Sequence, residues 1–182
     1  MLLEADRSCL VVIDMQERLV PAMQAPARTI RNARTLMTAA GELAIPVLVT
    51  EQYPRGLGRS VPDIAKAGEA AGAQVIEKLH FSSFAEPAFA EAFRATGRDQ
   101  AVIAGMEAHI CVLQTAVAMM RAGIEVYVVT DATSSRTLES EKACLDRLQA
   151  AGAGIVTTEM AVFEWLGQAG TPAFKALLPL IK

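Results

Sequence analysis

The run Cys9-Leu10-Val11-Val12-Ile13 is apolar at every position, and a segment with helical period follows it over about residues 27–44. Strands that are apolar at nearly every position are buried on both faces, which requires helices above and below the sheet. Similar runs recur with helical segments between most of them, at 46–50, 74–77, 101–104, 125–129 and 154–157. The pattern predicts an α/β protein with three layers, α/β/α, around a six-stranded parallel sheet.

The remaining segments give the expected helices and one long loop. Helical period predicts helices near 85–95, 109–122, 139–151 and 159–181, with Gly97, Gly123 and Gly152 as C-terminal caps. The longest stretch without clear period is 52–72, and its Gly and Pro content is typical of a surface loop. Loops of this length are often functional. No composition shift marks a linker, so we expect a single domain over 1–182.

Composition and net charge disfavour some classes of partner and favour one cellular compartment. The net charge is -3 and no run of Lys or Arg occurs, which disfavours nucleic acid and anionic membrane as partners. No export signal or membrane span is expected. The three cysteines have wide, irregular spacing, which favours a reducing compartment, so we expect a cytoplasmic protein. With 52% hydrophobic residues, the apolar surplus suggests a homo-oligomer.

Three residues that follow the predicted strands suggest chemistry. Ligands of open parallel sheets bind beyond the carboxyl ends of the strands, and Asp14, Lys78 and Cys111 follow the first, third and fourth runs. A helix start and a nearby cation both favour a thiolate, so we expect Cys111 to be alkylated near pH 6 faster than free cysteine. Asp14 is then a candidate base and Lys78 a candidate charge stabiliser.

Each of these residues also has a plain structural interpretation. A lone cysteine is usually a small core residue, which we expect of Cys9 and Cys144. An aspartate at a strand end is commonly a cap or turn former, which we expect of Asp131, and Lys78 taken singly is an ordinary solvated lysine. Neither histidine of the chain has the spacing of a zinc ligand, so no metal site is expected. The case for a catalytic site rests on the joint placement of the three residues.

These residues resemble those of the isochorismatase-like hydrolases, which include nicotinamidases and N-carbamoylsarcosine amidases. The resemblance is carried by Val12-Ile13-Asp14-Met15-Gln16, by Lys78, and by Gly105-Met106-Glu107-Ala108-His109-Ile110-Cys111-Val112 followed by Thr115-Ala116. It covers nearly the whole chain. The stretch from Thr50 to Gly58 is further similar to the isochorismatase-domain-containing hydrolases that occur from bacteria to animals.

The resemblance implies a catalytic triad of Asp14, Lys78 and Cys111 that hydrolyses a small-molecule amide through a cysteine acyl-enzyme, without a cofactor. It implies a non-proline cis peptide at Met106-Glu107, a bond that costs about 3 to 4 kcal/mol and persists only where the surrounding structure enforces it. It also implies an oxyanion hole formed by the backbone N–H groups of Glu107 and Cys111.

The chain departs from the nicotinamidases at the loop after the second strand. Those enzymes carry a metal site built from aspartate and histidines there, whereas this chain has Gln52 and Tyr53, and its first histidine is His80. Nicotinamide is therefore not the favoured substrate. The residues expected to wall the substrate pocket, each of which could equally belong to the core, are Gln52, Tyr53, Phe81, Phe84 and His109.

Other functions of a doubly wound sheet fit this sequence less well. A receiver-like module needs an acidic residue at the end of its third strand, where this chain has Glu77 just inside the run and then Lys78. A dinucleotide site needs a Gly-x-Gly-x-x-Gly motif after the first strand, which is absent. The remaining alternative is a catalytically vestigial oligomeric scaffold or ligand-binding protein on the same fold.

Overall fold

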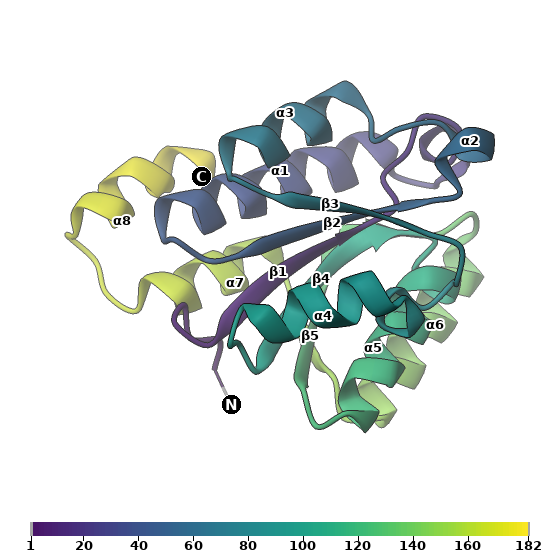
Figure 1. Ribbon diagram of the computed structural model, residues 1–182. Coiled ribbons are helices and arrows are strands. Elements are labelled where there is room, and N and C mark those ends of the chain that lie inside the picture. Colours follow the sequence, from purple (N-terminus) through teal and green to yellow (C-terminus); the bar gives the residue numbers. More distant parts are fainter. Residues whose placement is uncertain (1, 182) are drawn as a thin grey trace.

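The computed structural model describes residues 2–181, which form one six-stranded sheet between two layers of helices (Figure 1). All strand pairs are parallel, and the strand order is β3-β2-β1-β4-β5-β6. The predicted α/β fold with a six-stranded parallel sheet is therefore confirmed. The strands are β1 (Ser8–Ile13), β2 (Val47–Gln52), β3 (Gln74–Lys78), β4 (Gln100–Met106), β5 (Glu125–Ser134) and β6 (Gly154–Val156).

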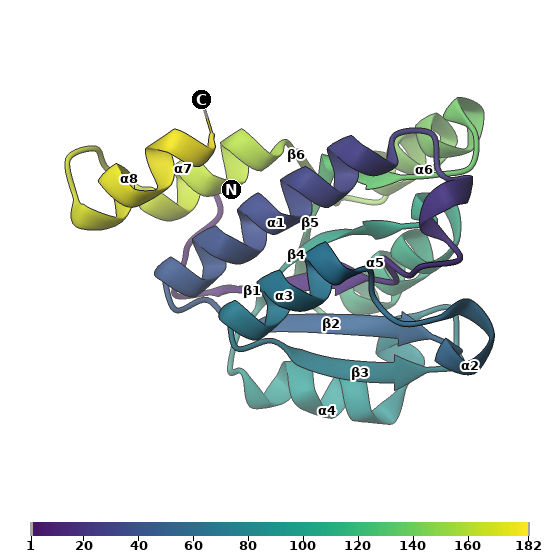
Figure 2. The same ribbon diagram turned by 90° about the horizontal axis from the view of Figure 1, so that it is seen from above.

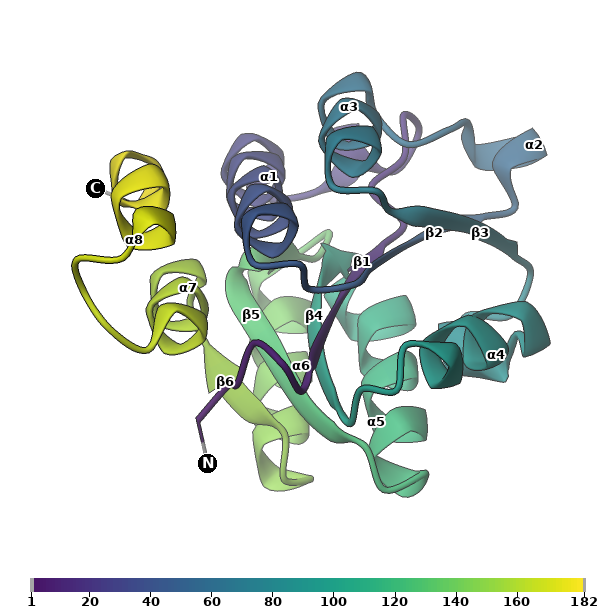
Figure 3. The same cartoon turned by 60° about the vertical axis from the view of Figure 1, so that its left-hand side comes forward.

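The helices cover the two faces of the sheet (Figures 2 and 3). One layer contains α1 (Pro26–Glu42), α3 (Pro62–Ala70), α7 (Thr158–Leu166) and α8 (Pro172–Leu177). The opposite layer contains α4 (Pro87–Ala95), α5 (Leu113–Arg121) and α6 (Leu138–Ala150). The short α2 (Pro54–Leu57) lies beyond the carboxyl end of β2, and the remaining turns are η1 (Val20–Ala22), η2 (Ser83–Ala85), η3 (Ala108–Val112) and η4 (Leu178–Leu180).

Burial on both faces explains why the central strands are apolar at every position. In β1, Leu10 and Val12 belong to the core under α1, while Val11 and Ile13 belong to the core on the other side. Cys9 and Cys144 are buried in that second core, which confirms them as core residues. Since the chain winds to both sides of β1, the strand order reverses there, which is where sheets of this kind bind their ligands.

Two predicted segments were wrong in their secondary structure. The stretch 52–72 is not a loop throughout, because it contains α2 and α3, and α3 is held by the burial of Ile64 and Gly68. The segment 159–181 is not one helix, because Gly167 and Gly170 adopt positive φ and separate α7 from α8. The predicted caps Gly97, Gly123 and Gly152 all have positive φ after α4, α5 and α6 and are confirmed.

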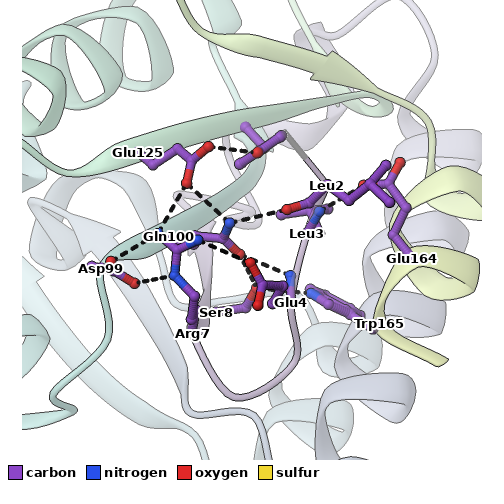
Figure 4. A network of polar contacts seen from close by, with 11 residues as sticks. Leu2, Leu3, Glu4, Arg7, Ser8, Asp99, Gln100, Glu125, Glu164 and Trp165 are labelled. Carbon is purple, nitrogen blue, oxygen red and sulfur yellow. Dashed lines mark hydrogen bonds and ion pairs between the residues drawn. The ribbon is translucent and has the colours of Figure 1, made fainter. Parts of the chain in front are cut away.

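A polar network joins the amino ends of the strands (Figure 4). Arg7 donates two hydrogen bonds to the carboxylate of Asp99, at 3.0 and 2.8 Å, and pairs with Glu125 at 3.2 Å. Gln100 donates to Glu125 at 3.0 Å and to the Leu2 carbonyl at 3.1 Å. This network anchors the first residues of the chain at the edge of the sheet opposite to the carboxyl ends of the strands.

Within the described residues, no helix has the length and apolar composition needed to cross a membrane.

Candidate active site

The strand register brings the predicted site residues to one edge of the sheet. Ile13 lies opposite Thr50 on one side and Gly105 on the other, and Gln52 lies opposite Lys78. The residues that end β1, β2, β3 and β4 are therefore neighbours. Asp14, Lys78 and the turn that carries Cys111 meet at this edge, as the sequence predicted.

Asp14 is the centre of the cluster. Lys78 Nζ donates to Asp14 Oδ2 at 2.7 Å, and Thr50 Oγ1 donates to Asp14 Oδ1 at 2.7 Å. The Cys111 thiol and the Asp14 carboxylate also interact, and each shifts the pKa of the other. The exposed fractions of Asp14, Lys78 and Cys111 are 0%, 2% and 3%. An acid, an amine and a thiol are thus held together out of water.

Burial dominates the protonation of this cluster. Burial raises the pKa of Asp14, although the charge of Lys78 and the hydrogen bonds from Lys78 and Thr50 act in the opposite direction. Burial also raises the pKa of the Cys111 thiol, to about 12, and the negative charge of Asp14 adds to this shift while Lys78 opposes it. The expectation of a thiolate at neutral pH is therefore not met in the resting protein, because burial, which is the largest cause, and the charge of Asp14 together outweigh the effect of Lys78 on the thiol pKa.

Lys78 is held by further acceptors at the end of β3. Its Nζ donates to Gln52 Oε1 at 2.6 Å and contacts the carbonyl oxygens of His80 and Phe81 at 3.3 and 3.4 Å. Gln16 fixes Gln52 in turn, since Gln16 Oε1 accepts from the Gln52 backbone N–H at 2.7 Å and Gln16 Nε2 donates to the Gln52 carbonyl at 3.0 Å. Gln52 therefore lies in the cluster, as predicted.

Three non-glycine residues with positive φ directly follow strands at this edge. They are Asp14 after β1, with φ 53°, Tyr53 after β2, with φ 37°, and Glu107 after β4, with φ 50°. Non-glycine residues in this region are uncommon, and such strain clusters at functional sites because the surrounding structure must enforce it. The strain supports a functional role for this edge.

The turn after β4 positions Cys111. Glu107 adopts a left-handed conformation, and the one-turn π-helical segment η3 follows it and carries the thiol. Arg136 pairs with the Glu107 carboxylate at 2.7 Å, and Cys144 Sγ contacts the Ala108 carbonyl at 3.0 Å. The predicted cis peptide at Met106-Glu107 was wrong, because the described residues contain no cis bond and the positive φ of Glu107 turns the chain instead.

One of the two backbone N–H groups expected to form the oxyanion hole already has a hydrogen-bond acceptor in this structure. The N–H groups of Ile110 and Cys111 both donate to the Glu107 carbonyl, at 2.8 and 3.1 Å. The Cys111 N–H is therefore already engaged, and a substrate oxygen would have to share it.

The predicted pocket residues lie in different parts of the structure. Tyr53 is 51% exposed and lines a cavity of about 390 Å³ together with Lys78, Leu79 and His80. Phe81, which is 55% exposed, follows directly in the chain. Phe84 instead packs against the core, with the guanidinium of Arg94 5.6 Å from its ring centre.

His109 lies in η3, the same turn that carries Cys111. Its Nδ1 is 3.0 Å from Ser135 Oγ, and it lines a second cavity, of about 410 Å³. Burial lowers the pKa of its imidazole, with Arg136 contributing in the same direction and Glu107 opposing. Within residues 2–181, His, Cys, Asp and Glu side chains form no group of three or more that could hold a metal ion.

Thr50 and Arg136 were not among the predicted site residues. The signal for Thr50 was a hydroxyl ending the apolar run 47–49, next to the strand that ends at Asp14. Arg136 had no such signal, because it lies beyond β5 and meets Glu107 only through the fold. Asp131 lies inside β5 and not at its end as predicted, and its carboxylate accepts from the backbone N–H of Thr158 at 2.8 Å at the start of α7.

Parallel strands wound to both sides of β1, with a thiol in the turn after β4, define an isochorismatase-like hydrolase fold. The chain belongs to the isochorismatase family, since the Isochorismatase domain model matches residues 8–160.

Curated relatives agree with this assignment. Isochorismatase domain-containing protein 1 of Salmo salar is 36% identical over 169 residues, which cover 93% of this chain and 59% of that protein. The chain thus spans little more than half the length of that relative. Secreted isochorismatase effector Isc1 of Phytophthora sojae is 36% identical, over 96% of this chain and 84% of that protein. Since that relative is described as secreted, the cytoplasmic location stays a prediction.

A solved structure gives the same fold. MAR1 ribonuclease from Caenorhabditis elegans superposes with a TM-score of 0.93 at 32% sequence identity, over 100% of this chain and 92% of that chain.

Proposed function

We propose that the protein is a cysteine hydrolase that cleaves the C–N bond of a small amide through an acyl-enzyme on Cys111. The observation that carries the proposal is the contact of the Cys111 thiol with a carboxylate that Lys78 and Thr50 hold in place. A nucleophile within hydrogen-bond reach of a base, which is itself oriented by a third group, is the arrangement that covalent catalysis requires.

The first half-reaction transfers one proton and forms one bond. Asp14 accepts the proton of Cys111 as Sγ attacks the carbonyl carbon, so that no free thiolate has to accumulate at neutral pH. The tetrahedral intermediate then collapses, the C–N bond breaks, and Asp14 returns the proton to the departing amine. A thioester between Cys111 and the acyl group remains, and Lys78 keeps its positive charge beside Asp14.

Water completes the cycle in the second half-reaction. Asp14 takes a proton from the attacking water, the C–S bond breaks, and the thiol of Cys111 regains its proton as the acid leaves. The raised pKa of Asp14 serves both steps, because a carboxyl group whose pKa lies closer to that of its proton donor is a stronger base. This cycle uses no metal or cofactor.

The oxyanion would be held by the backbone N–H groups of Glu107 and Cys111. The Cys111 N–H would divide its hydrogen bond between the Glu107 carbonyl and the substrate oxygen, and three-centre bonds of this kind are common at helix starts. Gln52, Tyr53, Phe81 and His109 remain the proposed neighbours of the substrate.

The proposed partners are a small molecule and further copies of the same chain. Exposed Val75, Leu79 and Phe81 lie on and just after the edge strand β3 and support a homo-oligomer. A net charge of -3 provides no positive field for nucleic acid, so RNA stays outside the proposal although the nematode relative is described as a ribonuclease.

The test is a panel of small amides, read by product release and by the intact mass of the protein. We expect an acyl adduct on the peptide that contains Cys111, and Cys111→Ala should lower turnover by on the order of 10⁴-fold or more. Cys9→Ala is the matched control, since it also removes a buried free thiol but lies in β1, outside the turn that carries Cys111, and it should retain turnover. Turnover by Cys111→Ala at the unaltered rate would contradict the proposal, and absence of both adduct and turnover would favour the scaffold interpretation.

A further inference from the structure

A cavity of about 410 Å³ lies between α5 and α6, and no residue of the triad lines it. Its polar wall residues all carry hydrogen-bond donors, and among the described residues that line it none is acidic. Apolar side chains of α5 form the rest of the wall. The polar residues are Ser82, His109, Gln114, Arg121 and Arg147.

Two exposed arginines line this cavity without an acidic residue beside them on its wall. Arg121 lies in the last turn of α5 and Arg147 in the last turn of α6. Within residues 2–181 neither of them forms an ion pair, although Lys142 and Asp146 beside Arg147 pair with each other. Two cations on the wall of one cavity repel each other, and an oxyanion between them would remove that repulsion.

Ser82 supplies an independent sign of a missing ligand. Its Oγ is buried and has no hydrogen-bond partner within the described part of the chain. Buried hydroxyl groups are nearly always satisfied, so an unsatisfied one on a cavity wall needs an explanation. An oxygen acceptor bound in the cavity would provide the partner after the Ser82 side chain rotates toward the cavity, since its Oγ is shielded from solvent in this structure.

Two features link the wall of this cavity to the turn that carries Cys111. His109 lies two residues before Cys111, and the backbone N–H of Ser83 donates to Thr115 Oγ1 on α5 at 2.8 Å. Helix side chains lean toward the helix N-terminus, so the Arg121 side chain extends from its Cα toward the turn that carries Cys111. A rise of 1.5 Å per residue puts the level of Val117 about 9 Å along the axis from Cys111.

We propose that this cavity binds an oxyanion. The substrates of the Cys111 site would then be amides that carry a carboxylate or phosphate group several bonds from the carbonyl carbon. Arg121 and Arg147 would neutralise the anion, and Ser82 and Gln114 would complete its hydrogen bonds. This inference rests on the proposed function for its substrate class, while the oxyanion site itself can be tested without turnover.

Binding is measured by calorimetry on the Cys111→Ala protein, which cannot form the acyl-enzyme. The probes are adipamate and hexanamide, which share an amide and differ in one carboxylate. We expect adipamate to bind at least tenfold more tightly than hexanamide, and Arg121→Ala or Arg147→Ala to abolish that difference. Arg31→Ala, which removes an exposed arginine of α1 on the other face of the sheet, is the matched control and should leave it intact.

Equal binding of the two probes, or an equal loss of adipamate binding in the Arg31→Ala control, would overturn the inference. Titration with inorganic phosphate identifies the anion: tighter binding than adipamate points to a phosphate-bearing amide, and weaker binding to a carboxylate. Unchanged urea midpoints of the arginine variants would show that they fold normally.

Turnover by the unaltered protein separates this inference from the proposed function. Hydrolysis of hexanamide as fast as adipamate would leave the proposed function standing and overturn the anionic substrate class. Arginine-dependent binding of adipamate with no hydrolysis of either amide would support the oxyanion site and contradict amide hydrolysis.

Discussion

The thiol of Cys111 is protonated at rest because burial and the Asp14 carboxylate both raise its pKa, to about 12. Asp14 and Lys78 act on it in opposite directions, so removing each should have opposite effects. Asp14→Asn removes the negative charge and leaves Lys78 to pair with the thiolate, which lowers the thiol pKa. Lys78→Ala removes the only opposing cation of the triad and raises the thiol pKa further.

The measurement is the rate of iodoacetamide labelling against pH, with the modified cysteine identified by peptide mass. At pH 7.5 we expect Cys111 to label roughly tenfold faster or more in Asp14→Asn, since each unit of pKa is a tenfold change in thiolate, and more slowly in Lys78→Ala. Cys9 and Cys144 are internal controls, and Asp131→Asn, which neutralises a partly buried aspartate inside β5, is the matched charge control. A shift of Cys111 in the same direction in both variants would contradict the electrostatic coupling.

At the scale of elements, the close approach of β4 to β1 places the nucleophile turn beside Asp14. Gly105 has φ 151° and lies against Ile13, where an added Cβ would come within 2.5 Å of the Ile13 carbonyl oxygen and 2.7 Å of the Ile13 Cβ. Ile13 belongs to a central strand bonded on both sides, so it cannot move away. Only glycine allows this contact between the two strands.

Gly105→Ala should therefore lower the free energy of unfolding by about 3 kcal/mol or more, as an overpacked core does. Gly72→Ala is the control, because Gly72 also has a positive φ but nothing lies within 4 Å of the added Cβ, and it should lose about 1 kcal/mol. Urea unfolding measures both. Equal losses in the two variants would show that backbone conformation, and not strand contact, accounts for the cost.

At the scale of the whole molecule, the candidate active site and the polar network around Arg7 lie at opposite ends of the strands (Figures 1 and 4). Burial opposes the ionisation of Glu125, but hydrogen bonds from Gln100 and Tyr127 and the charge of Arg7 outweigh it and lower the pKa of Glu125. Its carboxylate joins β4 and β5 to the segment that precedes β1.

Glu125→Gln should lower the free energy of unfolding by about 1 kcal/mol at pH 7. A carboxyl group with a lowered folded-state pKa stabilises the protein above its unfolded pKa, and this contribution is lost as pH falls through the folded pKa. The difference between the variant and the unaltered protein should therefore shrink below about pH 4.5, the ordinary pKa of glutamate. Urea unfolding at pH 7 and pH 3.5 measures it, with Glu42→Gln as an exposed control, and a difference independent of pH would contradict the assignment.

Much of the fold could be predicted because it depends on local pattern. Strands buried on both faces must be apolar at every position, as Val11 and Val12 show, and glycines such as Gly123 end helices by adopting positive φ. The segment 52–72 was mistaken for a loop because α3 buries only Ile64 and Gly68, which is too few residues for a visible period.

The sequence by itself determined the parallel α/β fold and the meeting of Asp14, Lys78 and Cys111, because the carboxyl ends of parallel strands share one edge. Tertiary structure alone decided the protonation of that cluster, since pKa values depend on burial and on the distances between charges from separate strands. It also decided the left-handed turn at Glu107 with its Arg136 partner, and the cavity shared by Arg121 and Arg147. These features arise between segments far apart in the chain, so no local pattern of residues encodes them.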